Sequence, residues 1–242
     1  MFKVSKSARP TDWTTKDYKD PVVVKQLKKD FHSKCYICEQ KHFPNLNVEH
    51  FIPHLDDEKL KLDWNNLYYA CSRCNSIKNK YYDDMLDCCN GDHLVEEWIK
   101  AYYRMPDEDI EVINACPDGH SYHTKAETSK ELIAKCFNNA NSGIQEVSKE
   151  DLRDKIIDVH SEFLDLRREF FKNLDNWLDE EKIDQARKIR HRLKSHYPFS
   201  AILRGHIEKD SKWRNALEDI DKIEILQSAN PHPSPLPEGE GV

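Results

Sequence analysis

The chain of 242 residues contains only six glycines, and none of them forms a Gly-rich loop that cradles phosphate. ATP hydrolysis by this chain is therefore not indicated. No charged and then apolar leader opens the sequence, and no apolar run approaches the length of a membrane span. We therefore expect a cytoplasmic protein with no membrane segment. Internal repeats are also absent.

An excess of positive charge is lacking as well. The formal net charge is −7 and the pI is about 6.0, which argues against a protein that binds nucleic acid by charge alone. Basic residues are nevertheless concentrated in two places. Residues 1–41 hold ten Lys or Arg against five acids, and residues 182–196 hold six against one. A nuclease with locally concentrated basic residues is therefore compatible with this composition.

Cysteine is present in a pattern that favours metal binding. Eight cysteines without a signal peptide indicate a reducing compartment rather than disulfides. Four of them form two C-x2-C pairs separated by 32 residues, namely Cys35, Cys38, Cys71 and Cys74. Paired knuckles of this kind hold a structural Zn²⁺, and this fits the spacing better than four thiols that merely pack. Cys88, Cys89 and Cys136 are interpreted as packing residues, and the spacing of Cys116, His120 and His123 matches no strong metal motif.

Between and beside the knuckles lie residues that suit phosphodiester chemistry. His50 is the candidate general base, because a near-neutral imidazole can take a proton from an attacking water. Glu49 is the candidate anchor for a divalent ion such as Mg²⁺ or Mn²⁺, which prefers oxygen ligands. Neighbours on a regular strand face opposite sides, so Glu49 and His50 can share a site only where the strand is bulged or ends. Alone, His50 would more simply be a histidine at a strand end.

These residues resemble the HNH endonuclease family in its ββα-metal fold, with the last histidine replaced by asparagine. The resemblance covers about residues 35–80 and implies a catalytic site of His50, Glu49, Asn66 and Asn75. It further implies that Glu49, Asn66 and Asn75 hold the catalytic ion. Many members carry aspartate where Glu49 stands. Asn65 is the alternative to Asn66, and either asparagine could instead cap a turn. Lys78 and Lys80 could contact phosphate or be solvated helix lysines.

The layout of the whole chain also resembles the HNH subunit of Septu-type anti-phage systems. The shared features are VEHFIPH, DWNNL, the LDC segment at residues 86–88 and a helical C-terminal half. This resemblance implies an antiviral effector nuclease in a hetero-oligomer with a partner ATPase, acting on DNA or RNA. The alternative function is a non-catalytic zinc adaptor that recruits a partner or nucleic acid.

The remaining pattern predicts an α+β fold, mostly α, in which a zinc-stapled ββα-metal nuclease module precedes an α-helical half. We expect a strand at 47–52 and a strand or loop at 60–62. We expect helices at 21–33, 75–86, 96–103, 128–138, 152–177, 181–195, 197–206 and 212–227, and a hairpin at 109–124. The cationic face of the 181–195 helix suits nucleic-acid phosphates, an acidic protein surface or solvent, and comprises Arg187, Lys188, Arg190, Arg192 and Lys194.

We divide the chain into five parts on this basis. They are a partly ordered N-terminal arm (1–20), the nuclease module (21–95), a connecting region (96–145), a helical region for partner docking (146–227) and a disordered tail (228–242).

Overall fold

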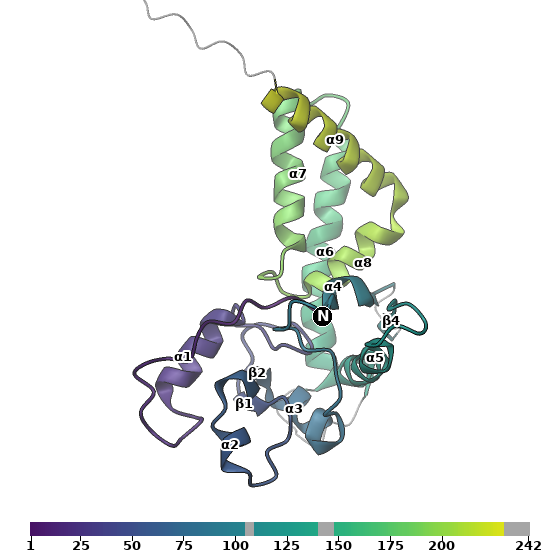
Figure 1. Cartoon of the computed structure of the whole chain (residues 1–242). Coiled ribbons are helices and arrows are strands. Elements are labelled where there is room, and N and C mark those ends of the chain that lie inside the picture. The colour runs from purple at the N-terminus through teal and green to yellow at the C-terminus, as the bar shows by residue number, and fades with distance from the viewer. Residues whose placement is uncertain (105–108, 140–147, 230–242) are drawn as a thin grey trace, which may run out of the picture.

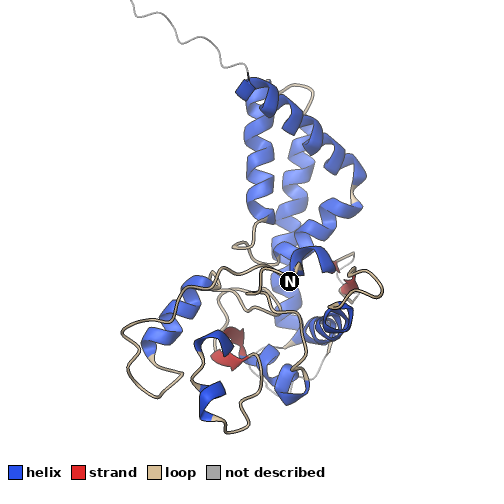
Figure 2. Ribbon diagram, in the orientation of Figure 1, coloured by secondary structure: helices blue, strands red, loops and turns tan. Residues whose placement is uncertain are grey.

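The computed structural model describes residues 1–104, 109–139 and 148–229 and has a mostly helical α+β fold with two small antiparallel sheets (Figures 1 and 2). Both sheets lie in one half of the molecule, and long helices form the other half. The predicted tail lies outside the described residues from residue 230 onward. The elements in chain order are α1 (Pro21–Asp30), β1 (Leu46–His50), α2 (Glu58–Lys61), η1 (Trp64–Asn66), β2 (Leu67–Cys71), α3 (Ser72–Lys78), η2 (Asn79–Tyr81), α4 (Val95–Trp98), β3 (Ile99–Tyr102), β4 (Glu111–Asn114), α5 (His123–Asn138), α6 (Lys149–Asn173), α7 (Asp179–Leu193), α8 (Ser200–Lys209) and α9 (Ser211–Ala229).

Helix α1 begins where the sequence predicts it. The Asp20 side chain accepts a hydrogen bond from the amide of Val22, and Pro21 occupies the first turn. The helix ends at Asp30, three residues earlier than expected. His32 and Ser33 adopt the left-handed conformation, with φ of 55° and 59°, so the chain turns away toward the first knuckle.

The hairpin of β1 and β2, followed by α3, supplies the expected order of two strands and a helix. Glu49 pairs with Tyr68 and His50 pairs with Leu67 across the hairpin. The second strand is β2, at residues 67–71. The sequence predicted a strand or loop at 60–62, but residues 60 and 61 lie in helix α2, which Asp57 caps, and residue 62 ends that helix. The apolar residues at 60–62 suggested a strand, whereas the Asp57 side chain caps a short helix at this point.

The second sheet corrects two predictions. The expected helix at 96–103 is one turn, α4, followed by strand β3. The expected hairpin within 109–124 contains a strand, β4, but this strand pairs with β3, which lies before the predicted hairpin. Pairing with a strand outside the segment leaves no signal within that segment.

Helix α5 ends at the predicted residue but begins five residues before the expected capping box. The hydroxyl of Thr128 lies inside the helix and donates to the carbonyl oxygen of Thr124. A Ser or Thr hydroxyl bonded to the residue four positions earlier is compatible with a helix interior, so the Thr128–Glu131 pattern does not mark a start here.

Helix α6 connects the two halves of the molecule (Figure 1). Ser148 and Asp151 form a capping box at its start. Its first buried residues, Leu152 and Ile156, join the hydrophobic core that contains both sheets. Phe163 and Phe170 join a second core with α7, α8 and α9. One helix therefore contributes to both cores.

The last three helices have nearly the predicted bounds. Helix α8 packs on β3 at Gly205, where a Cβ atom would collide with the carbonyl oxygen of Ala101. In the basic helix α7, Arg187 pairs with Glu224 and Arg190 pairs with Asp221, so two of its cations face acidic groups of α9. Within the described residues, no helix is both long and apolar enough to cross a membrane.

The N-terminal residues are packed rather than partly ordered. Met1, Phe2, Val4 and Trp13 are buried in the same core as the first knuckle. The ammonium of Lys34 lies 3.8 Å from the centroid of the Phe2 ring. The few apolar residues of this Lys-rich segment are buried, and this corrects the prediction of a partly ordered arm.

Candidate functional site

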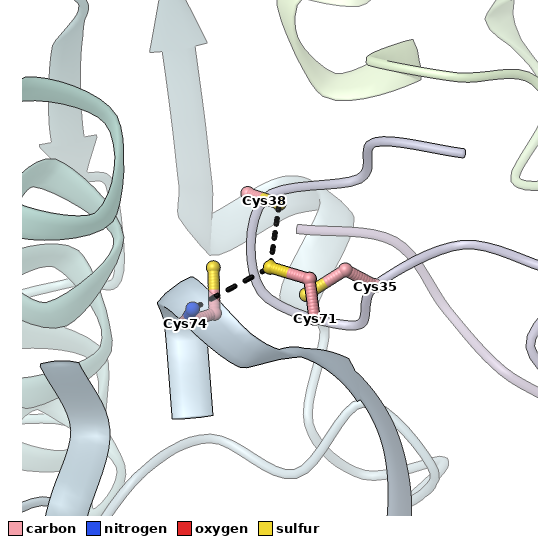
Figure 3. A group of neighbouring side chains, drawn as sticks. All are labelled: Cys35, Cys38, Cys71 and Cys74. Carbon is pink, nitrogen blue, oxygen red and sulfur yellow. Dashed lines mark hydrogen bonds between the residues drawn. The ribbon is translucent and has the colours of Figure 1, made fainter. Parts of the chain in front are cut away.

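The four knuckle cysteines come together in one buried cluster (Figure 3). Their sulfur atoms all lie within 4.8 Å of one another, and the Cys38 and Cys71 sulfurs are 3.9 Å apart. A tetrahedral zinc ion with bonds of about 2.3 Å separates its sulfur ligands by about 3.8 Å. The cluster therefore fits a structural zinc ion held by Cys35, Cys38, Cys71 and Cys74.

The surroundings of the cluster also suit bound thiolates. The amide of Cys74 donates to the sulfur of Cys71 at 3.4 Å, so Cys71 caps helix α3. Burial raises the pKa of Cys38 and of Cys74. A thiolate at each of these positions thus needs a cation among the four sulfurs. Another group of metal-binding residue types in the described part of the chain, Asp87, Cys88 and Cys89, lies in a separate turn.

Glu49, His50 and Asn75 line one cavity beside this cluster. Its volume is about 470 Å³, and its walls are Glu49, His50, Pro53, His54, Leu55, Asp56, Asn75, Ser76, Asn79 and Lys80. Strand β1 ends at His50, which is how two neighbouring strand residues come to face the same space. A strand that ends at His50 is one of the two arrangements under which the sequence allows Glu49 and His50 to share a site.

Glu49 is buried and paired. Its carboxylate accepts a hydrogen bond from the Lys78 ammonium at 2.9 Å, and that ammonium also donates to the His50 carbonyl at 3.1 Å. Burial raises the pKa of Glu49, and the charge of Lys78 acts in the opposite direction. Lys78 is itself fully buried. It therefore neutralises and positions Glu49, whereas the exposed Lys80 is the lysine that faces the cavity.

His50 is held by the loop that follows it. Its Nε2 lies 3.1 Å from the carbonyl oxygen of Lys61, so Nε2 carries the proton and Nδ1 is left to accept one. Burial lowers the pKa of His50, with the nearby His54 among the smaller causes. The ring also makes an edge contact with Tyr18, at a centroid distance of 4.7 Å. A neutral, oriented imidazole with a free acceptor nitrogen has the properties of a general base.

Asn66 is buried, and it is not among the residues that line the cavity. Its Oδ1 accepts from the Ile52 amide at 2.7 Å, and its Nδ2 donates to the carbonyls of Ile52 and Leu60 at 2.9 and 3.0 Å. Both amide protons and the oxygen are thus engaged with the backbone of the loop after His50. The structure separates Asn66 from Glu49, His50 and Asn75, and it leaves Asn65 exposed.

Asn79, His54 and Asp56 all line the cavity, although the sequence analysis did not assign them to the site. Asn79 lies one helical turn beyond Asn75, a spacing of four that could have identified it. His54 ends the VEHFIPH segment, where a second histidine is itself a signal, and its ring centroid lies 4.6 Å from that of His50. Asp56 carries no local signal, because only the fold of the loop brings it to the cavity.

The donor chemistry suits a hard divalent cation in part. Glu49 offers a carboxylate, and Asn75 and Asn79 offer carboxamides on the same cavity. Of the three ion ligands that the family resemblance implied, Glu49 and Asn75 line the cavity and Asn66 does not. In the weak metal motif at Cys116, the Nδ1 atom of His123 lies 3.0 Å from the carbonyl oxygen of Cys116, so this nitrogen is engaged with the backbone.

Comparison with known proteins agrees with this geometry. Residues 35–81 match the family model described as HNH endonuclease. An HNH endonuclease domain therefore occupies the part of the chain that carries both knuckles and the cavity. The chain is also similar to a protein named Septu protein PtuB from Bacillus mycoides (strain KBAB4). The two are 30% identical over an alignment of 146 residues, and the alignment covers 50% of this chain and 46% of that protein. No solved structure matches the chain.

Proposed function

We propose that this protein is a metal-dependent endonuclease that hydrolyses phosphodiester bonds of nucleic acid. The observation that carries the proposal is the shared cavity of Glu49, His50 and Asn75, with His50 oriented by the Lys61 carbonyl. In this view the domain is a ββα-metal module whose hairpin and helix are stapled by zinc. Its substrate is DNA or RNA.

In the proposed reaction, Nδ1 of His50 takes a proton from a water molecule that attacks the phosphorus atom. The lowered pKa of His50 keeps the ring neutral and ready to accept that proton at neutral pH. Glu49, Asn75 and Asn79 would hold a Mg²⁺ or Mn²⁺ ion, which supplies positive charge to the phosphoryl and leaving oxygens. Lys78 keeps the Glu49 carboxylate directed into the site, and Asn66 fixes the loop that aims His50.

A nicking assay with and without a chelator tests this function. His50→Ala should lower the cleavage rate by about 10²- to 10⁴-fold and leave the fold intact. His42→Ala, which changes an exposed histidine outside the cavity, is the matched control. Cleavage by His50→Ala at the wild-type rate would refute the base assignment. Absence of cleavage by the wild-type protein with every divalent ion would favour the second candidate function, a non-catalytic zinc adaptor.

We further propose a cytoplasmic role in anti-phage defence, in which a partner ATPase holds this subunit and controls it. The similarity to a protein named Septu protein PtuB supports this role. The helical region from residue 146 to residue 227 would dock the partner. The boundaries of the other predicted regions are proposed together with this one. Mass photometry of the chain co-expressed with its neighbouring gene product should reveal a hetero-oligomer. Two separate species under those conditions would count against the partner.

A further inference from the structure

His54 is the second imidazole on the wall of the candidate active-site cavity. It lies four residues after His50, and the two ring centroids are 4.6 Å apart. It is half-buried, and its ring also approaches Tyr18 at a centroid distance of 6.5 Å. The proposed reaction does not use this side chain, although it faces the same space as the base.

A backbone hydrogen bond determines which nitrogen of His54 carries the proton. The amide of Asp56 donates to Nδ1 of His54 at 3.1 Å. Leu55 and Asp56 adopt φ values of 43° and 68°, and this turn brings the amide back toward the ring. A nitrogen that accepts an N–H bond cannot carry a proton, so the neutral ring has its proton on Nε2.

The two histidines therefore present opposite groups to the cavity. His50 donates through Nε2 to the Lys61 carbonyl and keeps Nδ1 as an acceptor. His54 accepts at Nδ1 and keeps Nε2–H as a donor. In this form Nε2 can neither bind a metal ion nor take a proton from water. It can donate a hydrogen bond, and an oxygen of a bound phosphate group is a suitable acceptor.

We propose that His54 is a further catalytic residue, whose Nε2–H donates a hydrogen bond to a non-bridging oxygen of the scissile phosphate. The proposal rests on the nuclease function given above. No proton is transferred by His54. Negative charge on the non-bridging oxygens must be stabilised while the phosphorus is attacked, and a fixed donor in a half-buried site does this without rearrangement. Removal of one such donor typically costs about 10²- to 10³-fold in kcat.

The protonation pattern is tested first, on the metal-free full-length protein. Long-range ¹H–¹⁵N correlation spectra should show His54 at neutral pH as the neutral tautomer with the proton on Nε2. Exposed His42 provides an internal reference for a ring outside the cavity. A proton on Nδ1 of His54 would overturn the proposal. This readout does not depend on activity.

Two substitutions then separate hydrogen bonding from packing. His54→Phe keeps an aromatic ring against His50 and Tyr18 but has no donor, and kcat should fall by about 10²- to 10³-fold. His54→Gln keeps a terminal N–H donor and should recover a measurable part of that loss. Both variants should retain the wild-type melting temperature within a few degrees. Equal loss in the two variants would show that the N–H donor does not account for the effect, and would overturn the proposal.

Phosphorothioate substrates provide the decisive measurement, because sulfur accepts hydrogen bonds poorly. Each diastereomer, with one non-bridging oxygen replaced by sulfur, is compared with the normal phosphate in Mg²⁺ and in Mn²⁺. For one diastereomer, the slowing seen with wild type should shrink in His54→Phe, and Mn²⁺ should not abolish the difference between the two proteins. An identical sulfur effect in both proteins would overturn the role of His54 alone. Failure of the wild type to cleave any substrate would instead overturn the nuclease function.

Discussion

Neighbouring residues of this chain differ in role because burial differs between them. Asn65 and Asn66 are chemically identical, yet the first side chain is exposed and the second bridges two segments of the loop that follows His50. Lys78 and Lys80 differ in the same way, since one ammonium is buried against Glu49 and the other is exposed at the cavity. Residue type alone therefore does not assign these roles.

The asparagine pair provides a matched test at this scale. Asn66→Ala leaves the backbone groups of Ile52 and Leu60 without their partners, and we expect it to lower the free energy of unfolding by about 2–4 kcal/mol. Asn65→Ala should change that free energy by less than about 0.5 kcal/mol. Urea denaturation of both variants measures the difference. Equal effects would contradict the role assigned to Asn66.

At the scale of elements, β1, β2 and α3 are short, and β2 and α3 each contribute a residue to the cysteine cluster. A two-stranded hairpin is marginal by itself in water. Cys71 ends β2, Cys74 lies in α3, and the first knuckle follows α1, so one zinc ion would connect the first knuckle to two elements whose cysteines lie more than 30 residues further along the chain. The binding free energy of the metal then contributes to folding.

Zinc content is therefore expected to determine whether this region folds. Elemental analysis should find about one equivalent of zinc in the folded protein, and Cys38→Ser should reduce it and unfold the β1–β2–α3 region. Cys89→Ser, at a half-buried thiol outside the cluster, should keep the metal. Less than about half an equivalent in folded wild-type protein would contradict the assignment.

Helix α6 carries a second element-scale feature at the junction of the two cores. His160 is buried there, with its Nε2 atom 3.2 Å from Nδ1 of His206, and Tyr103 packs on its ring. Burial, with a smaller effect of His206, lowers the pKa of His160 to about 4. Asp210 and Arg167 are the charged groups that act on His206. The junction therefore favours a neutral imidazole.

Stability should consequently fall in acid. An unfolded histidine has a pKa of about 6.5, so between that pH and about pH 4 the unfolded chain binds a proton that folded His160 does not. The stabilising effect of the neutral ring is complete above pH 6.5 and is lost as the pH falls through this range. Urea denaturation should show a weaker acid dependence for His160→Phe than for wild type, while exposed His42→Phe should match wild type. Parallel pH curves for all three proteins would refute the assignment.

At the scale of the whole molecule, the N-terminal residues and helix α8 meet beside the first knuckle. Arg204 of α8 donates to the carbonyl oxygen of Met1 at 2.9 Å. Lys34 pairs with Glu39 at 3.0 Å, and the Glu39 carboxylate accepts a hydrogen bond from Ser200 at 2.9 Å. The zinc-binding region is therefore packed against the N-terminal segment and the helical half together.

This packing predicts that the first residues stabilise the whole protein. Phe2→Ala removes a fully buried ring and should lower the free energy of unfolding by about 3–5 kcal/mol. Lys3→Ala, at the adjacent exposed position, should have little effect. Thermal or urea unfolding of the two variants provides the comparison. A tolerated Phe2→Ala would support the loose arm that the sequence predicted.

The sequence predicted this molecule best where the signal is local. The helices at 152–177, 181–195 and 212–227 correspond to α6, α7 and α9 because an apolar period of three and four residues is repeated along each. The predicted helix at 96–103 was wrong because β3 depends on β4, whose residues lie further along the chain. The domain boundaries and the catalytic roles stay predictions.

The sequence by itself determined the cysteine spacing, the His50 segment and the HNH domain, because each depends on residues that are close in the chain. Only the tertiary structure decided that Asn66 faces the loop, that Lys78 neutralises Glu49 and that His54 and Asn79 share the cavity with His50. It also decided that the N-terminal residues are buried. The physical reason is that burial and hydrogen-bond partners arise from contacts between distant segments, which no local spacing encodes.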